Sequence, residues 1–242
     1  MQTNVLNFRI KRAFRRYGMA ISHDKGTNGE SNKPVQDRLL DAAEELFCEH
    51  GFDGASVRDI AAAAHCNIAS VNYYFGGKDK LYLEVWRRHL GAMRDTRVAS
   101  IKKVMSQQGA EPSLEDLLTS YANAFVGPLV DKHTGGRFMK LMAREMVDKH
   151  LPQNVFVEEM IIPVMTALQQ ALMRICPELD EVKARLAILS VVGQLVHTIC
   201  AETMLEQTDN LEMPRFELAE VVKHIVKFSA AGIRAYAEEK TE

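Results

Sequence analysis

The sequence predicts an all-α fold in which a small three-helix bundle at the N-terminus is followed by a larger helical domain. Apolar residues recur at helical spacing, and residues 113–242 show none of the polar–apolar alternation that marks strands. Proline residues stand where helices are expected to begin or to be separated, at Pro112, Pro152, Pro177 and Pro214. The chain has 242 residues, of which 47% are hydrophobic and 26% charged, so we expect a packed core in one or two domains.

Positive charge is concentrated at the N-terminus, although the formal net charge of the whole chain is only −2. Residues 1–33 carry seven basic and two acidic side chains, whereas residues 34–88 carry six basic and nine acidic ones. We interpret residues 1–33 as a basic, flexible arm that could lie on DNA phosphates or in a minor groove. Its second half has the composition of a linker, so a disordered tail, or residues upstream of a start at Met19, would fit as well.

The composition argues against several classes of protein. Four cysteines lie far apart and form no Cys-x-x-Cys pair, which disfavours a disulfide framework or a zinc site and favours reduced cytoplasmic thiols. No uninterrupted apolar run reaches the ~18 residues that a membrane span needs. The sequence contains no Gly-x-Gly-x-x-Gly, phosphate loop or His-Glu-x-x-His motif. We therefore expect a cytoplasmic protein that is not an enzyme, does not enter a membrane and holds no metal or cofactor.

Residues 34–81 predict a bundle of three helices. From Pro34 to His50 the apolar residues follow helical spacing, and Gly51 ends this first helix. Three helices of this size are too small to be comfortable alone, so a larger partner domain is implied.

Two short helices, joined by a tight turn, complete this bundle. The first, Val57 to Ala64, begins after Ser56, whose hydroxyl can accept a hydrogen bond from a free backbone N–H. The second, Ile68 to Phe75, begins after Asn67 and ends at Gly76. This arrangement is a helix-turn-helix, in which the second helix is presented to the major groove of DNA.

A helical wheel divides the second short helix into two faces. Ile68, Val71 and Phe75 cluster on the side that should anchor the helix in the bundle. The opposite side should face the groove, and it carries Ala69, Ser70, Tyr73 and Tyr74, with Asn72 on its flank. Ala69 could touch a thymine methyl group, Ser70 could bond either base type, and Asn72 could pair with adenine.

We expect DNA contacts from this helix and from its two neighbours. The tyrosine hydroxyls and Lys78 suit phosphates, although Tyr73 and Tyr74 could instead pack against the next helix. Arg58 could reach a phosphate or a base edge, or it could pair with Asp59 or another acid on the surface. The expected contacts, which include Ile68 although the wheel places it on the anchoring side, are Ser56, Arg58, Ile68, Ala69, Ser70, Asn72, Tyr73, Tyr74 and Lys78.

Three stretches of this region resemble the N-terminal domain of TetR-family transcriptional regulators. They are Leu-Leu-Asp-Ala-Ala-Glu-Glu-Leu-Phe from Leu39, Gly-Phe-Asp-Gly-Ala-Ser-Val-Arg-Asp-Ile-Ala from Gly51, and Val-Asn-Tyr-Tyr-Phe-Gly-Gly-Lys-Asp-Lys-Leu from Val71. The resemblance covers about residues 35–85 and implies an all-helical homodimer. It further implies that the dimer binds an operator and releases it when a small molecule enters the C-terminal domain.

The resemblance also implies roles for single residues. Ser56 and Lys78 match positions at which the family contacts phosphates, and Asn67 occupies the position of the usual serine cap. Two residues depart from the family pattern: His65 replaces the common turn glycine, and Asn72 replaces the common tyrosine. Histidine is among the residues that better tolerate a left-handed turn position, whereas the family's tyrosine contact does not carry over to Asn72.

A long helix is expected to start after Lys78 and to end near Met93. It links the expected DNA-binding domain, residues 34–81, to residues 82–242, which we interpret as a ligand-binding and dimerisation domain. Movement of this helix would change the separation of the two recognition helices in a dimer. Trp86 could report on that movement or could simply belong to the core.

Five further helices are expected in the second domain. Their ranges are Ser113 to Asp131, Gly135 to Lys149, Asn154 to Ile175, Asp180 to Glu206 and Arg215 to Glu239. Gly127-Pro128 and Pro163 could break or kink two of them. The fourth helix is apolar almost all round, which is typical of a core helix or a subunit interface. In the TetR family the last two long helices usually pair with their mates in the dimer, and we adopt that arrangement.

Adaptable apolar side chains gather in the middle of the second domain, which suits a pocket for a small apolar effector, although an ordinary core would look the same. The expected pocket residues are Phe125, Phe138, Met142, Met146, Phe156, Met160 and His197. Gln194 and His197 could recognise a ligand, or they could be hydrogen-bonded residues of the core or interface. The stretch from Arg137 to Met146 also resembles the CecR-like branch of the family, which is associated with efflux and antibiotic sensitivity.

These observations predict a DNA-binding transcriptional regulator with double-stranded operator DNA as its partner. The more specific hypothesis is a homodimeric repressor that a small apolar ligand releases from the operator. The alternative is a helix-turn-helix protein whose C-terminal domain responds to a protein partner instead.

Overall fold

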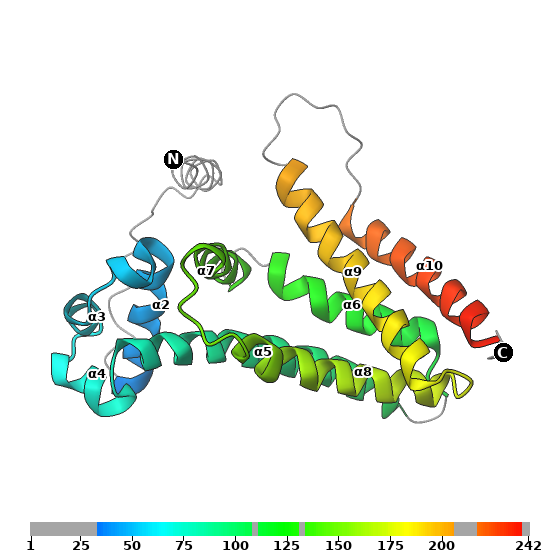
Figure 1. Ribbon diagram of the computed structural model, residues 1–242, viewed down its shortest axis with the longest axis horizontal. Coiled ribbons are helices and arrows are strands. Elements are labelled where there is room, and N and C mark those ends of the chain that lie inside the picture. The colour runs from blue at the N-terminus through cyan, green and yellow to red at the C-terminus, as the bar shows by residue number, and fades with distance from the viewer. Residues whose placement is uncertain (1–32, 108–110, 131–133, 206–216, 239–242) are drawn as a thin grey trace.

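The structure, a computed structural model, describes residues 33–107, 111–130, 134–205 and 217–238. In these residues the chain forms α-helices and one π-helical turn and no strand, which confirms the all-α prediction. The elements, labelled as in Figure 1, are α2 (Val35–Gly54), α3 (Val57–Ala63), α4 (Ile68–Phe75), α5 (Lys78–Met105), α6 (Leu114–Val130), α7 (Thr134–Asp148), η2 (Val157–Ile161), α8 (Ile162–Ile175), α9 (Glu181–Leu205) and α10 (Leu218–Glu238). The expected basic arm lies outside the described residues, apart from Lys33.

The N-terminal bundle packs α2, α3 and α4 around a core that the first half of α5 completes. Its fully buried side chains include Leu39, Phe47, Ile60, Val71, Leu81 and Trp86. Trp86 is therefore a core residue. α2 is interrupted at Gly51, whose φ of 75° lies in the left-handed region that glycine adopts without steric cost.

α5 is the long helix along which the other elements are arranged (Figure 1). It has 28 residues and ends at Met105, about three turns beyond the end that was expected near Met93. That expectation was wrong because Asp95 and Arg97 interrupt the apolar pattern after Met93, although Val98, Ile101 and Val104 continue it. The first half of α5 belongs to the N-terminal core, and its second half belongs to the core of the C-terminal helices.

Among the C-terminal helices, α6 and α8 pack on the second half of α5, whereas α9 packs on α8 and α6, and α10 packs on α6 and α9. Figure 1 shows α8 running alongside α5, and α9 and α10 at the opposite end of the molecule from α3 and α4. Their shared core includes the fully buried residues Leu117, Tyr121, Leu168 and Leu172. α7 differs from these helices, because it packs against α2 and inserts Phe138 and Leu141 into the N-terminal core.

Four of the five helices expected in this part begin and end within a few residues of their expected limits. The fifth, expected as one helix from Asn154 to Ile175, is divided into the π-helical turn η2 and α8. Pro163 is the second residue of α8, and it has no N–H to donate to the carbonyl of Glu159. The widened turn lies directly before this missing hydrogen bond. The helix α6, by contrast, continues through Pro128.

Candidate DNA-binding interface

Caps fix both short helices of the helix-turn-helix as the sequence predicts. The Asp59 N–H donates to Ser56 Oγ at 3.1 Å, and the Ala69 N–H donates to Asn67 Oδ1 at 2.9 Å. His65 takes a φ of 52° in the turn between the helices. Gly76, with a φ of 72°, ends α4 in the left-handed conformation. The chain direction on both sides of α4 is therefore set by local hydrogen bonds.

One side of α4 is anchored in the bundle. Val71 and Phe75 are buried there, one turn apart, against α3 and α5. Ile68, which the wheel places on the same side, is 51% exposed. This part of the prediction was wrong, because two buried side chains suffice to anchor a helix of two turns, and Ile68 at its first position lies beyond the covered part.

The other side of α4 is presented to solvent. Ala69, Asn72, Tyr73 and Tyr74 are exposed and Ser70 is half-buried. The Tyr73 side is the most open, since the residue is 82% exposed, and its ring meets the Tyr74 ring edge-on at 4.9 Å between centroids. A large aromatic side chain that is this exposed on a capped helix is available for contact with another molecule.

The candidate phosphate-binding groups around α4 differ in whether they already contact another group of the protein. Arg58 is exposed and forms no ion pair within the described part of the chain. Lys78 Nζ lies 4.3 Å from the centre of the Phe52 ring, so its charge is held beside α2 by a cation–π contact. The Ser56 hydroxyl donates to the Asp59 carboxylate at 2.5 Å. A phosphate at Ser56 would therefore have to compete with Asp59, whereas Arg58 is free.

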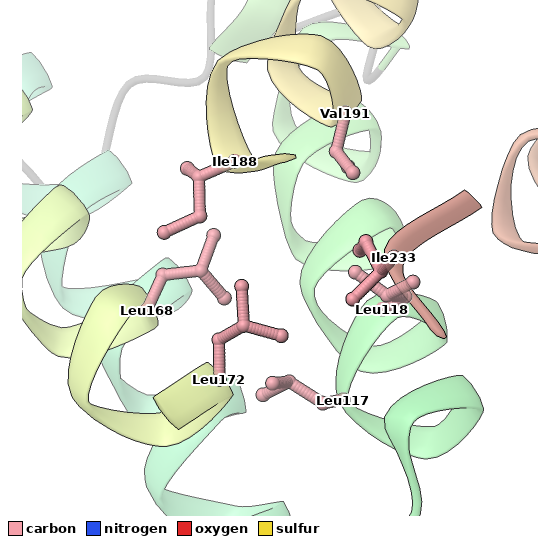
Figure 2. Close-up of a pocket in the computed structure, with 7 residues that line it drawn as sticks. All are labelled: Leu117, Leu118, Leu168, Leu172, Ile188, Val191 and Ile233. Atoms are coloured by element: carbon pink, nitrogen blue, oxygen red, sulfur yellow. The ribbon is translucent and has the colours of Figure 1, made fainter. Parts of the chain in front are cut away.

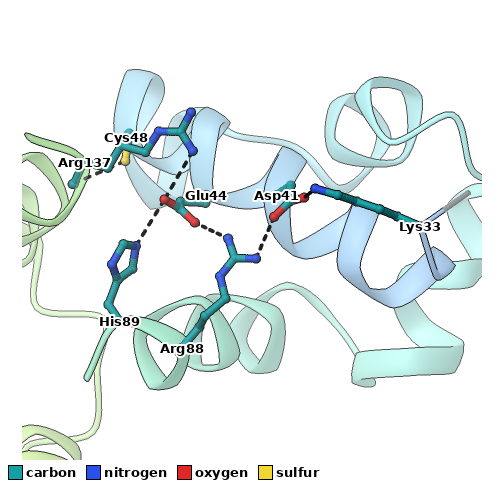
Figure 3. Close-up of polar contacts among 7 residues, drawn as sticks. All are labelled: Lys33, Asp41, Glu44, Cys48, Arg88, His89 and Arg137. Atoms are coloured by element: carbon teal, nitrogen blue, oxygen red, sulfur yellow. Dashed lines mark hydrogen bonds and ion pairs between the residues drawn. The ribbon is translucent and has the colours of Figure 1, made fainter. Parts of the chain in front are cut away.

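A buried charge cluster, which the sequence reasoning missed, joins this bundle to α5 and α7. Glu44 of α2 is buried, and its carboxylate contacts Arg88, His89 at 3.2 Å and Arg137 at 3.6 Å (Figure 3). Burial alone would raise the pKa of Glu44, but the hydrogen bonds and charges of His89 and Arg88 lower it to about 2. Arg88 also binds Asp41 at 2.7 Å. The only signal in the sequence was an acid on the apolar face of the first helix.

Arg144 and Glu145 of α7 make three further hydrogen bonds with the same bundle and with α5. Arg144 donates from Nε to the Cys48 carbonyl at 3.1 Å and also donates to the Glu49 carbonyl, near the interruption of α2. Tyr82 on α5 donates its hydroxyl to Glu145 at 2.9 Å. The N-terminal bundle is thus joined to the rest of the chain by hydrogen bonds to α7 as well as by α5 itself.

The seven residues expected to line a ligand pocket are only partly brought together, and Phe125 and Met160 both contact Arg97. Phe125 lies in the C-terminal core, whereas Phe138, Met142, Phe156 and Met160 belong to or pack on the N-terminal core. Met146 is 73% exposed and His197 is also on the surface. Gln194 donates to Ser229 at 3.1 Å and so connects α9 to α10.

A small pocket in the described part of the molecule is lined by none of these seven residues. Figure 2 shows its lining, which is entirely aliphatic and comes from α6, α8, α9 and α10: Leu117, Leu118, Leu168, Leu172, Ile188, Val191 and Ile233. The side chains face one another across a narrow space. A ligand larger than a few atoms could enter only if these helices moved apart.

The outer face of α9 is apolar and uncovered. Val182, Leu186, Leu189 and Val196 are exposed at successive spacings of four, three and seven residues, with Gly193 in the same row. Leu189 is 65% exposed. By length and composition alone this helix could cross a membrane. Core helices of soluble proteins meet the same two criteria, so a single such helix is weak evidence for a membrane span. Exposed Phe228 lies on α10, beside it. Such a patch on a helix pair is typical of a protein–protein contact.

Two family profiles match this chain. One, described as "Bacterial regulatory proteins, tetR family", matches residues 39–85, which contain α3 and α4. The other, described as "Tetracyclin repressor-like, C-terminal domain", matches residues 123–232. Together the two profiles cover more than half of the chain.

Among curated proteins, the chain is 26% identical over 126 residues to the transcriptional repressor NicS of Pseudomonas putida, which is 52% of this chain and 55% of NicS. It is 50% identical over 46 residues to the transcriptional dual regulator CecR of Shigella flexneri, 19% of this chain and 20% of CecR. The matched stretches thus span only between about a fifth and about half of these relatives.

Among solved structures, a TetR-family transcriptional regulator from Mesorhizobium loti superposes with a TM-score of 0.63 at 18% identity. The superposition covers 86% of this chain and 98% of that one. At this level of identity the likeness concerns the fold alone.

Proposed function

The chain belongs to the TetR family of bacterial regulatory proteins, and we propose that it is a cytoplasmic, homodimeric transcriptional repressor that a small molecule releases from its operator. The DNA-binding part of this proposal rests on one observation above all. α4 is capped at both ends and anchored by Val71 and Phe75, and it holds its opposite side, with Tyr73 foremost, out into solvent. That is the arrangement a recognition helix needs to enter a major groove.

The contacts we propose combine base reading with phosphate binding. Ala69, Ser70 and Asn72 have side chains that can reach base edges, while Tyr73, Tyr74, Arg58 and Lys78 suit phosphates. The helix-turn-helix region carries more acidic than basic groups, so a single copy would bind DNA weakly. Two copies double the number of phosphate contacts, which is why dimerisation is part of the proposal.

The uncovered face of α9 supports the dimer. Its apolar row is long enough to pair with the same row of a second copy, and Gly193 would let the two helices approach closely. Phe228 on α10 would extend the contact. A two-fold interface of this kind uses the same patch on both subunits.

Release by a small molecule is proposed for the helices between these two ends. α5 carries the C-terminal core on its second half and supports α4 with its first half, and the Glu44 cluster and Arg144 tie α2 to α5 and α7. A ligand that parts α6 from α8 would shift α5 or α7, and with them the recognition helix. The two recognition helices of the dimer would then no longer match the operator.

DNA binding by the purified full-length protein tests the proposal. The DNA upstream of its own gene, labelled with a fluorophore, is titrated with protein at 50, 100 and 200 mM salt. For about four phosphate contacts per dimer we expect the affinity to fall roughly a hundredfold over this range. Scrambled DNA of equal length is the control. Absent binding, or binding that ignores both salt and sequence, would remove the proposal.

A further inference from the structure

Arg97 is a buried arginine on the core-facing side of α5. The residue is 4% exposed, and Met93 and Ile101, one turn before and one turn after it, are buried apolar residues. Arginine is almost never fully buried without a partner of opposite charge. Burial lowers the pKa of Arg97 from its ordinary value, yet a guanidinium does not lose its proton in proteins. The side chain therefore stays charged inside the molecule.

The groups around Arg97 do not neutralise this charge. Nη1 lies 3.2 Å from Sδ of Met160, a weak acceptor, and Cζ lies 4.1 Å from the centre of the Phe125 ring. Nε has no hydrogen-bond partner among the described residues. Within the same residues no aspartate or glutamate forms an ion pair with Arg97.

Other arginines of the molecule do have carboxylate partners. Arg88 binds Glu44 in the buried cluster of Figure 3, and Arg234 makes two hydrogen bonds of 2.6 Å with Glu115 on the surface. Arg97 is far more deeply buried than Arg234 and needs such a partner more. A planar acceptor with two oxygens would bind best to the unpaired Nε–H and to an Nη–H of Arg97.

The apolar surroundings of Arg97 lead toward the aliphatic pocket. Tyr121 and Phe125 follow Leu117 by one and two turns on α6, and all three belong to one hydrophobic cluster. Phe125 is thus about 12 Å along the helix from Leu117, which lines the pocket in Figure 2. On the other side, Met160 lies in η2, and π-helical turns occur frequently at functional sites.

We propose that the small molecule is an amphiphilic carboxylic acid whose carboxylate pairs with Arg97 and whose apolar body lies along α6 toward the aliphatic pocket. The inference rests on the proposed function only in treating this ligand as the releasing molecule. The carboxylate oxygens accept from Nε and from one Nη group, and the flexible Met160 thioether moves off Nη1 to admit them. The apolar body then fills space that opens between α6 and α8.

This placement connects the ligand to the DNA-binding end. Met160 packs in the N-terminal core, and its neighbour Glu159 forms a 3.0 Å ion pair with Arg87 on α5. Displacing Met160 therefore disturbs the contact between η2 and the half of α5 that supports α4. Occupation of the Arg97 site and loosening of the recognition helix follow from the same movement.

Matched pairs of compounds test the carboxylate preference in the full-length protein. We would titrate decanoate against decanamide, and 4-phenylbutyrate against 4-phenylbutyramide, and follow the fluorescence of Trp86, the single tryptophan of the chain, and the melting temperature. We expect at least one carboxylate to bind about tenfold or more tightly than its amide, since a hydrogen bond to a charged group is lost in the amide. Equal binding of both members in both pairs, or no binding of either acid, would overturn the inference.

Two variants test whether Arg97 is the residue that makes the acid bind more tightly than the amide. Arg97→Met should melt at the same temperature as the parent or higher, because an unpaired buried charge is removed, and it should bind acid and amide equally. Arg94 lies one turn before Arg97 on α5 and is already paired with Asp95. Arg94→Met should therefore keep the preference for acid over amide. A preference that survives Arg97→Met would contradict the assignment. Should Arg97→Met not fold, Arg97→Lys serves in its place, because it keeps the charge, loses the fork and should retain only part of the preference.

The operator titration separates this inference from the proposed function. If the parent binds its operator and is released by an amide as readily as by its acid, the repressor proposal stands and the Arg97 site falls. If acids bind through Arg97 but no DNA is bound, the site stands and the repressor proposal falls.

Discussion

Tyr73 is the side chain on α4 that depends least on the rest of the fold. Its ring is 82% exposed and touches only Tyr74 among the aromatic residues described. Tyr73→Ala should therefore weaken operator binding, by about tenfold or more if the ring or hydroxyl meets DNA, and should leave the melting temperature almost unchanged. Fluorescence anisotropy with operator DNA and a thermal melt check the two halves of this prediction.

The companion variant Tyr73→Phe divides the effect between ring and hydroxyl. If the hydroxyl bonds a phosphate, Tyr73→Phe should weaken operator and scrambled DNA by the same factor, because phosphate contacts carry no sequence information. A Tyr73→Ala protein that binds its operator as tightly as the parent would place α4 differently on DNA.

Glu44 makes stability depend on acid pH. Its pKa is lowered to about 2 in the folded chain from 4.5, so its contribution is complete above about pH 4.5 and is lost as the pH falls toward 2. By linkage this amounts to roughly 3 kcal/mol. We expect Glu44→Gln to be less stable at pH 7 by about that amount and to lose less stability than the parent between pH 5 and 2, as urea unfolding at several pH values would measure.

Asp41 provides the matched control at the half-exposed end of the same cluster. Arg88 and Lys33 lower the pKa of Asp41 against the effect of partial burial, but an exposed pair contributes at most about 1 kcal/mol. Asp41→Asn should thus change the acid dependence much less than Glu44→Gln. Equal effects would mean that Glu44 is not the centre of the cluster.

The sequence alone predicted residues whose role is local and missed those whose role is tertiary. Ser56, Asn67 and Gly76 cap helices through neighbours a few positions away, and the structure has them as predicted. Ile68, by contrast, shares a wheel face with Val71, but only the neighbouring helices decide which of them is covered. The same holds for Arg97, because only the packing of α5, α6 and η2 shows that no carboxylate of the described residues lies beside it.

At the scale of elements, the outer face of α9 carries a row of exposed apolar residues that no other described helix covers. Leu189→Glu places a charge in the middle of that face. We expect the parent to sediment as a dimer and the variant as a monomer, because burying an unpaired carboxylate at the interface costs more than the contact gains. Analytical ultracentrifugation measures the oligomeric state, and operator affinity should fall with it.

Met146→Glu is the matched control for this prediction. Met146 is an exposed apolar residue on α7, outside the α9 face, and the same change there should leave the dimer intact. A Leu189→Glu protein that still sediments as a dimer would show that the subunits meet elsewhere.

Helix positions were predicted well wherever an apolar stripe and a terminal signal agree, as for α4, α6 and α7. Helix positions were predicted badly where a charged residue or a proline interrupts the apolar stripe. α5 was expected to end about three turns too early because Arg97 occupies a core position. The division between η2 and α8 depends on how the chain accommodates Pro163, which a periodic pattern does not reveal.

At the scale of the whole molecule, one continuous structure leads from the apolar face of α9 to the exposed side of α4. α5 runs through both cores, and α7 closes the N-terminal one. The sequence indicated the two domains but not that α7 would pack on α2, because the contact between them is long-range and partly electrostatic. For that reason the expected ligand-pocket residues were distributed over two cores.

A footprint of the full-length protein on the DNA upstream of its gene tests most directly the claim that two α4 helices bind one operator. We expect two protected half-sites related by a two-fold axis, whose centres are one helical turn, about 34 Å, or a multiple of it apart. Leu189→Glu should lose both half-sites together. A single protected site, or even protection along the whole fragment, would contradict this claim.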